Sequence, residues 1–165
     1  MKNKPFIEIV LLVCLGILTS LSLSPYNFFI INFFTFSLFY LFLNSKLKRN
    51  KNSKLFFLYG WSFGFGYFLT NLYWISISLT YDQSLKFLIP FTTILIPGFL
   101  ALFYGTISCL FKIFHPKNLI SSFLTFSLIF GIVEFLRGLI LTGFPWNLIV
   151  HSFSKQVEFL NITSI

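Results

Sequence analysis

The sequence predicts an all-α fold: a polytopic membrane helix bundle of about five transmembrane helices, with its N-terminus in the cytoplasm. Three observations predict it. Of the 165 residues, 56% are hydrophobic and only 10% are charged, and long apolar runs alternate with short polar connections. A soluble domain carries about a quarter charged residues, and one of this size leaves much of its surface in water. A bilayer is therefore the expected solvent.

The apolar runs predict helices near residues 5–23, 26–43, 55–79, 87–111 and 119–141. Each has about the 17–25 residues that a helix needs to cross the hydrocarbon. The first run resembles a secretory signal. However, Pro25 directly follows the small-residue stretch "SLS", and a second apolar run begins at once. A helical hairpin is therefore favoured over cleavage. Together these helices define an N-terminal transmembrane domain over residues 1–147.

Residues 148–165 are mixed in character and too short to span a bilayer by themselves. Apolar residues return over 160–165. We expect a periplasmic-side segment that leads into a truncated next helix, with an interfacial helix as the alternative.

Basic residues predict the orientation of the bundle. Lys2 and Lys4 precede the first run, five Lys or Arg residues occupy 44–54, and two lysines lie in 112–117. With five crossings, these clusters share one side. The opposite side has Asp82 and Lys86 without a cluster. Because loops rich in Lys and Arg stay in the cytoplasm, the stretch "TGFPWN" should emerge on the outer face.

The composition argues against several kinds of chemistry. The net charge is +8, but no basic stripe with interleaved aromatic residues is present, so no nucleic acid is expected as a partner. Cys14 and Cys109 have no His or acidic neighbour in sequence and are interpreted as packing residues. We find no metal-ligand spacing, cofactor motif or pairing of nucleophile and base. No metal, no cofactor and no catalytic residue is therefore expected in this chain.

Two charged residues interrupt the fifth apolar run. Glu134 and Arg137 are three residues apart, so they share one face of the expected helix. Unpaired charges inside a membrane are costly. Two interpretations stay open: a structural ion pair, or a polar site that contacts a lipid headgroup. The run ends in Gly143, Phe144, Pro145 and Trp146, and Trp is typical of the membrane–water boundary.

The third run combines small and polar residues. Gly60, Gly64 and Gly66 predict a face on which helix backbones approach closely. Asn71 and Trp74 follow near the expected outer end, where an amide seeks a hydrogen-bond partner on another helix or a bound headgroup. Asn71 and Trp74 therefore join Glu134, Arg137 and the Gly-Phe-Pro-Trp stretch as candidates for substrate or lipid contact.

Three blocks occur in a recognisable order: "SLSPYNFF", "GWSFGFGYFLTNLYWISISL" and "EFLRGLILTGFPWNLIVHS". Together they resemble the N-terminal membrane region of the apolipoprotein N-acyltransferase family. Many members have glycine where this chain has Asn71. The third block is the most specific, and the family pattern falls on Glu134, Phe135, Leu136, Arg137, Gly138, Thr142, Gly143, Phe144, Pro145 and Trp146.

The resemblance implies an acyltransferase of the bacterial inner membrane, multi-pass, with its functional face toward the periplasm. In the family, a nitrilase-like domain with a Glu-Lys-Cys triad follows. That domain moves an acyl chain from a phospholipid donor to a diacylglyceryl-apolipoprotein acceptor. Neither cysteine of this chain matches that nucleophile. We therefore expect the chain to hold lipid and substrate in the bilayer, to lack the triad and to be inactive alone.

Alternatives remain. The chain is either part of a longer enzyme, the membrane subunit of a split enzyme whose nitrilase-like domain is separately encoded, or a non-catalytic scaffold or lipid-binding bundle. A transporter fits less well, because the polar residues gather at one rim and no midplane site interrupts the helices.

Overall fold

The computed structural model describes residues 5–47, 52–140 and 147–153, and within these ranges the chain forms helices and no strand. The predicted all-α membrane bundle is confirmed. In order, the elements are α1 Pro5–Ser20, α2 Ile30–Leu47, α3 Ser53–Asn71, α4 Tyr73–Ser78, η1 Leu79–Tyr81, η2 Gln83–Leu88, α5 Ile89–Phe114, α6 Leu119–Ile140 and η3 Ile149–Phe153.

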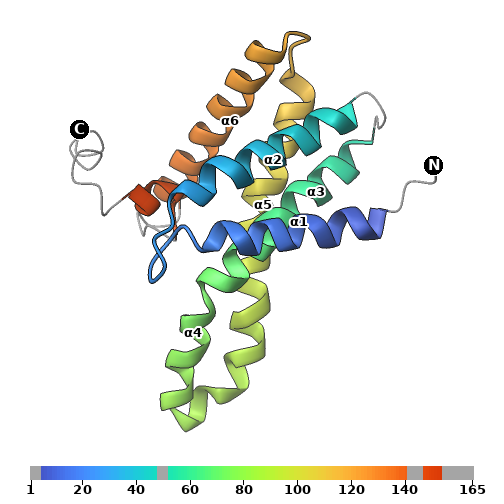
Figure 1. Cartoon of the computed structure of the whole chain (residues 1–165). Helices are drawn as coiled ribbons and strands as arrows, with labels where there is room; N and C mark the ends of the chain where they lie inside the picture. The colour runs from blue at the N-terminus through green and yellow to red at the C-terminus, as the bar shows by residue number, and fades with distance from the viewer. Residues whose placement is uncertain (1–4, 48–51, 141–146, 154–165) are drawn as a thin grey trace.

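Helix α3 is the centre of the bundle. It packs most extensively against α5 on one side and α1 on the other, while α6 packs on α5 and α2 on α1. Helix α4, the two short 3₁₀ helices and the start of α5 form a hairpin that projects away from the remaining helices (Figure 1). The arrangement therefore has a compact part around α3 and a separate arm.

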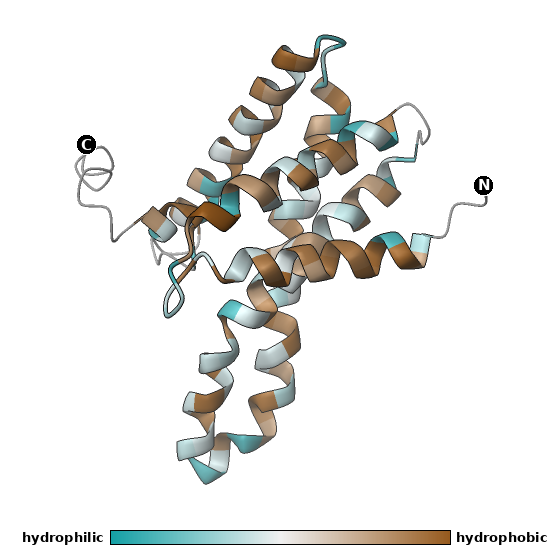
Figure 2. Cartoon of the chain, viewed as in Figure 1, coloured by the Kyte–Doolittle hydropathy of each residue, from teal (hydrophilic) through white to brown (hydrophobic). Residues whose placement is uncertain are grey.

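The outer surface of the helices is apolar. Figure 2 shows hydrophobic residues along the helices and hydrophilic residues gathered at the connections. Among the described elements, three stretches are long and apolar enough to cross a membrane: Ile30–Leu47, Gln83–Phe114 and Leu119–Ile140. Helix α1 is apolar but has only 16 residues, and α3 carries Gly, Ser and Tyr because protein surrounds it. The predicted five crossings and the side of the N-terminus stay predictions.

Contacts between helix ends assign the connections to two ends of the bundle. Lys46 near the end of α2 contacts Glu8 near the start of α1, and Lys112 near the end of α5 donates to Ser53 at the start of α3 over 3.1 Å. These residues define the basic end. At the opposite end, Asn32 of α2 donates to Ser152 of η3 over 2.7 Å. We call that end the η3 end.

Glu8 locks three helices together at the basic end. Its carboxylate pairs with Lys46 of α2 and accepts a hydrogen bond from the Tyr59 hydroxyl of α3. Nothing in the sequence pattern marks Glu8, Lys46 and Tyr59 as a cluster. The sequence carries little sign of these contacts, because Lys46 and Tyr59 lie 38 and 51 residues away from Glu8. Such pairing removes the cost of a lone carboxylate in an apolar helix.

The third expected helix, residues 55–79, is divided at Leu72, where α3 ends and α4 begins. The reason is local. The Thr70 hydroxyl donates to the Gly66 carbonyl over 3.0 Å, and the Asn71 amide donates to the Tyr67 carbonyl over 3.0 Å. Side chains that bond to the backbone one turn earlier compete with helix continuation and bend helices.

Three glycines bring α3 close to its neighbours. A Cβ atom on Gly60 would overlap the backbone carbonyl oxygen of Tyr104 on α5, and one on Gly64 would lie 2.8 Å from the Tyr104 Cβ. On the opposite side, a Cβ on Gly66 would overlap the backbone carbonyl of Val13 on α1. Small residues allow such close approach between membrane helices.

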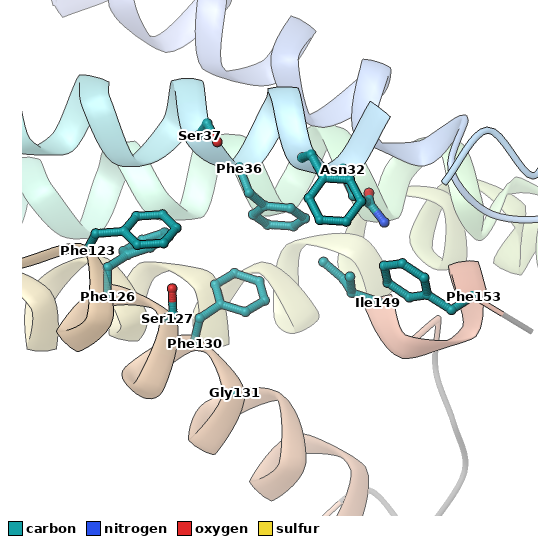
Figure 3. Close-up of a pocket in the computed structure, with 11 residues that line it drawn as sticks. Asn32, Phe36, Ser37, Phe123, Phe126, Ser127, Phe130, Gly131, Ile149 and Phe153 are labelled. Atoms are coloured by element: carbon teal, nitrogen blue, oxygen red, sulfur yellow. The ribbon is translucent and has the colours of Figure 1, made fainter. Parts of the chain in front are cut away.

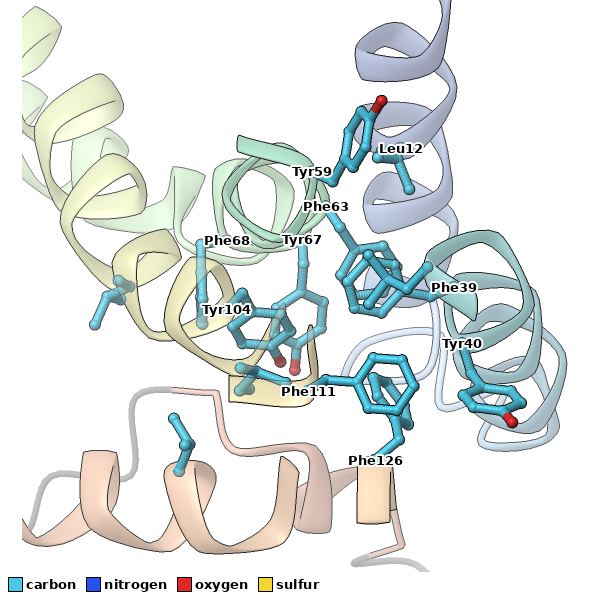
Figure 4. Close-up of a cluster of buried hydrophobic side chains, with 14 of the residues drawn as sticks. Leu12, Phe39, Tyr40, Tyr59, Phe63, Tyr67, Phe68, Tyr104, Phe111 and Phe126 are labelled. Atoms are coloured by element: carbon cyan, nitrogen blue, oxygen red, sulfur yellow. The ribbon is translucent and has the colours of Figure 1, made fainter. Parts of the chain in front are cut away.

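Aromatic rings fill the interior around α3 (Figure 4). Phe39 of α2 stacks on Phe63 of α3 with ring centroids 4.3 Å apart, and Tyr104 of α5 lies 5.8 Å from Phe63. Tyr104 in turn meets Phe130 of α6 edge to face at 5.4 Å. Rings in these geometries contribute beyond the area they bury, so this cluster couples four helices.

The glycine contacts lead to a stability prediction. Gly60→Ala should destabilise the bundle by about 1–3 kcal/mol, because the added methyl group forces α3 and α5 apart. Gly98→Ala is the matched control, since among the described residues its Cβ would meet only Trp61, at an ordinary 3.8 Å, and it should change stability by less than about 0.5 kcal/mol. Reversible unfolding in mixed detergent micelles measures both. Equal effects would refute the packing role of Gly60.

The orientation has its own test. Alkaline phosphatase fused after Leu79, at the tip of the arm, should be active, because the arm is expected outside. The same reporter fused after Leu47, at the basic end, should be inactive, because basic connections stay in the cytoplasm. Green fluorescent protein at the same positions should give the reverse pattern. A cytosolic reporter after Leu79 would overturn the orientation.

Candidate functional site

Glu134 and Arg137 form a buried ion pair on α6. The Arg137 Nε donates to Glu134 Oε1 over 3.1 Å, and Nη2 donates to Oε2 over 3.0 Å. Their side chains are only 12% and 1% exposed, respectively. The three-residue spacing on one helix brings them to the same face. The forked geometry is that of a strong, charge-assisted pair.

The pair also holds groups from other elements. The Arg137 guanidinium lies 4.9 Å from the centre of the Phe68 ring of α3, a distance at which a cation is attracted to an aromatic face. Its Nη2 contacts the Asn147 carbonyl at 3.5 Å, and Glu134 Oε2 accepts a hydrogen bond from the Ile149 amide over 3.2 Å. The pair therefore fixes the backbone at the start of η3 against α6 and α3.

Two tyrosines complete this polar cluster. The Tyr67 hydroxyl donates to the Asn147 carbonyl over 2.8 Å. Asn147 is held in a left-handed conformation with φ of 46°, which Asn tolerates better than most residues. Tyr104 is 0% exposed, and its hydroxyl points the same way as that of Tyr67 (Figure 4). Both hydroxyls therefore belong to the buried polar cluster.

A pocket of about 520 Å³ lies at the junction of α1, the α1–α2 connection, the end of α3 and α4. Asn71 and Trp74 both line it, and Trp74 is 50% exposed. Aromatic side chains with one wet edge are typical of the membrane–water boundary. None of the described lining residues is charged, so this part of the pocket suits the uncharged part of an amphipathic molecule. The lining residues are Ile17, Ser20, Leu21, Ser24, Pro25, Tyr26, Leu69, Thr70, Asn71, Tyr73 and Trp74.

The pocket and the ion pair are connected through Tyr67, which belongs to neither. Asn71 donates its amide to the Tyr67 carbonyl over 3.0 Å, and the Tyr67 hydroxyl reaches Asn147, which also contacts Arg137. The candidates therefore form two groups joined through Tyr67. Gly143, Phe144, Pro145 and Trp146 lie outside the described residues.

His151 lies beside this cluster on η3. Partial burial, together with the nearby positive charge of Arg137, lowers the pKa of the His151 imidazole below its usual value, while Glu134 opposes the shift. Within residues 5–47, 52–140 and 147–153, no group of three or more His, Cys, Asp or Glu side chains could hold a metal ion.

Sequence reasoning missed several residues of the site. Tyr67, Phe68 and Tyr104 read as part of aromatic-rich apolar runs, and nothing in their spacing distinguishes them from core residues. Only the pairing of α3 with α5 and α6 brings their rings and hydroxyls to Arg137 and Asn147. Asn147 acts through its backbone carbonyl, which carries no sequence signal.

The fold and site define a membrane-embedded helical domain with a buried ion pair near one end. The family described as the apolipoprotein N-acyltransferase N-terminal domain matches residues 15–165. The chain belongs to this family, as predicted from its three sequence blocks.

Individual relatives agree with the family match. The chain is similar to the apolipoprotein N-acyltransferase of Rickettsia typhi, 37% identical over 155 residues, which are 92% of this chain and 30% of the relative. It is also similar to the enzymes of Rhizobium etli and Brucella melitensis. Each is 33% identical over 140 residues, which are 81% of this chain and 26% of the relative. The chain thus spans less than a third of the length of the curated relatives it matches.

A double-mutant cycle tests the ion pair. Arg137→Leu should cost about 3–5 kcal/mol of stability, because it leaves the Glu134 carboxylate buried without its partner. The double variant Glu134→Gln with Arg137→Leu should lose less than the sum of the single changes, by about 1–3 kcal/mol. Unfolding in mixed micelles supplies the four free energies. Phe135→Leu, on the exposed side of α6, is the matched control. Additive losses would contradict the pairing.

Proposed function

We propose that this chain is the membrane-embedded part of an enzyme that transfers an acyl chain from a phospholipid to the N-terminal diacylglyceryl-cysteine of bacterial lipoproteins. The observation that carries the proposal is the family match over residues 15–165. The names of the relatives give the activity. The apolar helices agree with substrates that are anchored in a bilayer. The proposed location is the inner membrane, with the η3 end toward the periplasm.

The reaction requires a nucleophile that breaks the acyl ester of the phospholipid and forms a thioester, from which the amino group of the acceptor then takes the acyl group. We assign this nucleophile to a nitrilase-like domain, either in the same polypeptide or separately encoded. The cysteines of this chain are poorly placed. Cys14 lies in the middle of α1, and Cys109 donates to the Ser53 carbonyl over 3.4 Å, at the basic end.

In this proposal the pocket with Asn71 and Trp74 receives the ester region of a lipid. The acyl chains of a lipid lie in the hydrocarbon, and its ester groups lie at the boundary with water. At that boundary an aromatic ring can contact the chains while an amide hydrogen-bonds to the ester. Trp74 supplies apolar contact area, and Asn71 supplies a carbonyl oxygen and an amide on the α3–α4 junction. Thr70 and Ser20 place hydroxyl groups around the same space.

Glu134 and Arg137 act in this proposal as positioning residues. The two side chains bind each other through two hydrogen bonds, which suits a role in holding structure. Their further bonds go to Asn147 and Ile149. These bonds place residues 147–149, which we call the rim segment, next to α6. The pair thus shapes the surface beneath the catalytic domain. Breaking the pair would displace residues 147–149 from α6. Holding reactants in the correct geometry is a large part of catalysis.

A chimera tests the proposal directly. This chain replaces the matching N-terminal region of the Rickettsia typhi relative, and the product is assayed for acylation of a diacylglyceryl peptide in bacterial membranes. We expect acyl transfer, because the helices present both lipid substrates to the attached domain. A chimera that is inserted and folded but makes no triacylated product would argue against a substrate-holding role.

Variants of the chimera separate the two groups of residues. Trp74→Ala should raise KM for the phospholipid with a smaller change in kcat, because it removes contact with bound lipid. Arg137→Leu should lower kcat at equal protein level, because the rim is misplaced. Phe135→Leu, at an exposed neighbouring position on the same helix, should leave both constants within about twofold. If Arg137→Leu turned over substrate at the unchanged rate, the ion pair would have only a packing role.

A further inference from the structure

Tyr67 of α3 serves the two groups of candidate residues through two different atoms. Its hydroxyl donates a hydrogen bond to the Asn147 carbonyl of the rim segment over 2.8 Å. Its own backbone carbonyl accepts the side-chain amide of Asn71, which lines the pocket, over 3.0 Å. The side chain of Tyr67 therefore holds the rim segment, while its backbone holds the wall of the pocket.

The backbone of α3 is held tightly at this position. A Cβ atom on Gly16 of α1 would overlap the Phe63 carbonyl oxygen and lie 2.8 Å from the Tyr67 nitrogen, so α1 touches the α3 backbone itself. Tyr67 is 0% exposed, and its ring centre lies 4.9 Å from that of Phe68 and 6.0 Å from that of Tyr104. Side chains packed this closely stay near one rotamer. The hydroxyl is therefore presented from a fixed point.

The Asn147 carbonyl receives two donors from inside the bundle. The Tyr67 hydroxyl reaches it over 2.8 Å, and the Arg137 Nη2 contacts it at 3.5 Å, so Tyr67 makes the shorter contact. Asn147 has a φ of 46°, a left-handed conformation that is unfavourable for residues with a side chain. A carbonyl bonded inside the bundle helps to hold the backbone in this turn.

The far end of η3 is held by α2. Figure 3 shows Ile149 and Phe153 of η3 beside Asn32 of α2, at one end of an apolar groove of about 300 Å³ between α2 and α6. Asn32 donates to Ser152 over 2.7 Å. These contacts do not involve α3, the helix whose end forms the pocket wall. A direct hydrogen bond from α3 to this segment comes from the Tyr67 hydroxyl.

From this geometry we infer that Tyr67 is a positioning residue for acyl transfer. Its hydroxyl acts through Asn147 and keeps the rim segment in a fixed place relative to the pocket. This role rests on the proposed function, in which a catalytic domain above the rim segment meets lipid held in the pocket. Loss of the hydroxyl should therefore slow turnover and leave lipid binding intact, because the carbonyl that holds Asn71 remains.

Tyr67→Phe in the chimera tests this role. The variant keeps the ring and the backbone carbonyl and removes only the hydroxyl. At equal protein level we expect kcat to fall about five- to tenfold, the factor that one buried hydrogen bond supplies. KM for the phospholipid should stay within about twofold. An unchanged kcat, or a KM that rises as much as kcat falls, would overturn the inference.

Tyr40→Phe is the matched control. Tyr40 of α2 is also buried, and its hydroxyl donates to the backbone carbonyl of Leu119 over 3.3 Å. Leu119 begins α6, at the opposite end of that helix from Arg137. The same group is thus removed from the same kind of bond, away from the site, and kcat should stay within about twofold. Equal losses in the two variants would mean that Tyr67 contributes only stability.

A spin label on η3 follows the position of this segment without an activity assay. In the full 165-residue chain with Cys14→Ser and Cys109→Ser, the label is attached to Val150→Cys, a position that is 44% exposed in η3. Tyr67→Phe should increase the mobility of the label and narrow its spectrum, whereas Tyr40→Phe should not. An unchanged spectrum in Tyr67→Phe would refute the inference even if the chimera is active. If the chimera is inactive, the label still shows whether Tyr67 holds the segment, so the two failures are distinguished.

A change on the acceptor side provides a second test. Asn147→Val keeps the backbone carbonyl, but a β-branched residue strongly disfavours the φ of 46°. This variant should lower kcat about as much as Tyr67→Phe, because each change loosens the same contact. The double variant should lose no more than about twofold beyond the larger single loss. Losses that multiply in the double variant would show that the two residues act independently, which contradicts the inference.

Discussion

The close approach of α3 to α5 and α1 is the contact on which the rest of the molecule depends. Glycines on both sides of α3 remove the side chains that would otherwise separate the helices, so the backbones meet directly. This spacing brings the rings of Tyr67, Phe68 and Tyr104 together, and it sets how far Phe68 reaches toward Arg137. A wider separation would remove the Phe68 ring from the guanidinium and leave Arg137 with its polar partners alone, in a medium where charged groups are costly.

The described part of the bundle contains few charged side chains. Two ion pairs shielded from solvent lie at opposite ends of it. At the basic end, Glu8 draws α1, α2 and α3 together through Lys46 and Tyr59. At the η3 end, Glu134 and Arg137 join α6 to α3 and to the backbone of Asn147 and Ile149. Apolar packing is non-directional, so these polar contacts fix which helix ends meet.

The sequence allowed the helical membrane bundle to be predicted, because composition and run length reflect the solvent around the chain. The spacing of Glu134 and Arg137 likewise places them on one helix face. Other features depend on contacts between distant segments. Glu8 finds Lys46 only after α1 and α2 have packed. Tyr67 and Tyr104 look like ordinary core residues until α6 covers them. The break at Leu72 follows from side-chain bonds of Thr70 and Asn71 that compete with the helix, a balance that hydropathy does not register.

Tyr67 connects the two groups of candidate residues, and its two hydrogen bonds explain why they belong to one site. Its backbone carbonyl anchors Asn71 at the wall of the pocket, and its hydroxyl anchors Asn147 beside Arg137. Because α3 is held on both sides, Tyr67 has little freedom to move relative to either partner. The wall of the pocket and the segment around Asn147 are therefore held in one fixed relation by a single residue. In the function proposed above, an attached catalytic domain would meet a lipid in that pocket at a constant distance, and holding reacting groups in a fixed geometry is a large part of catalysis.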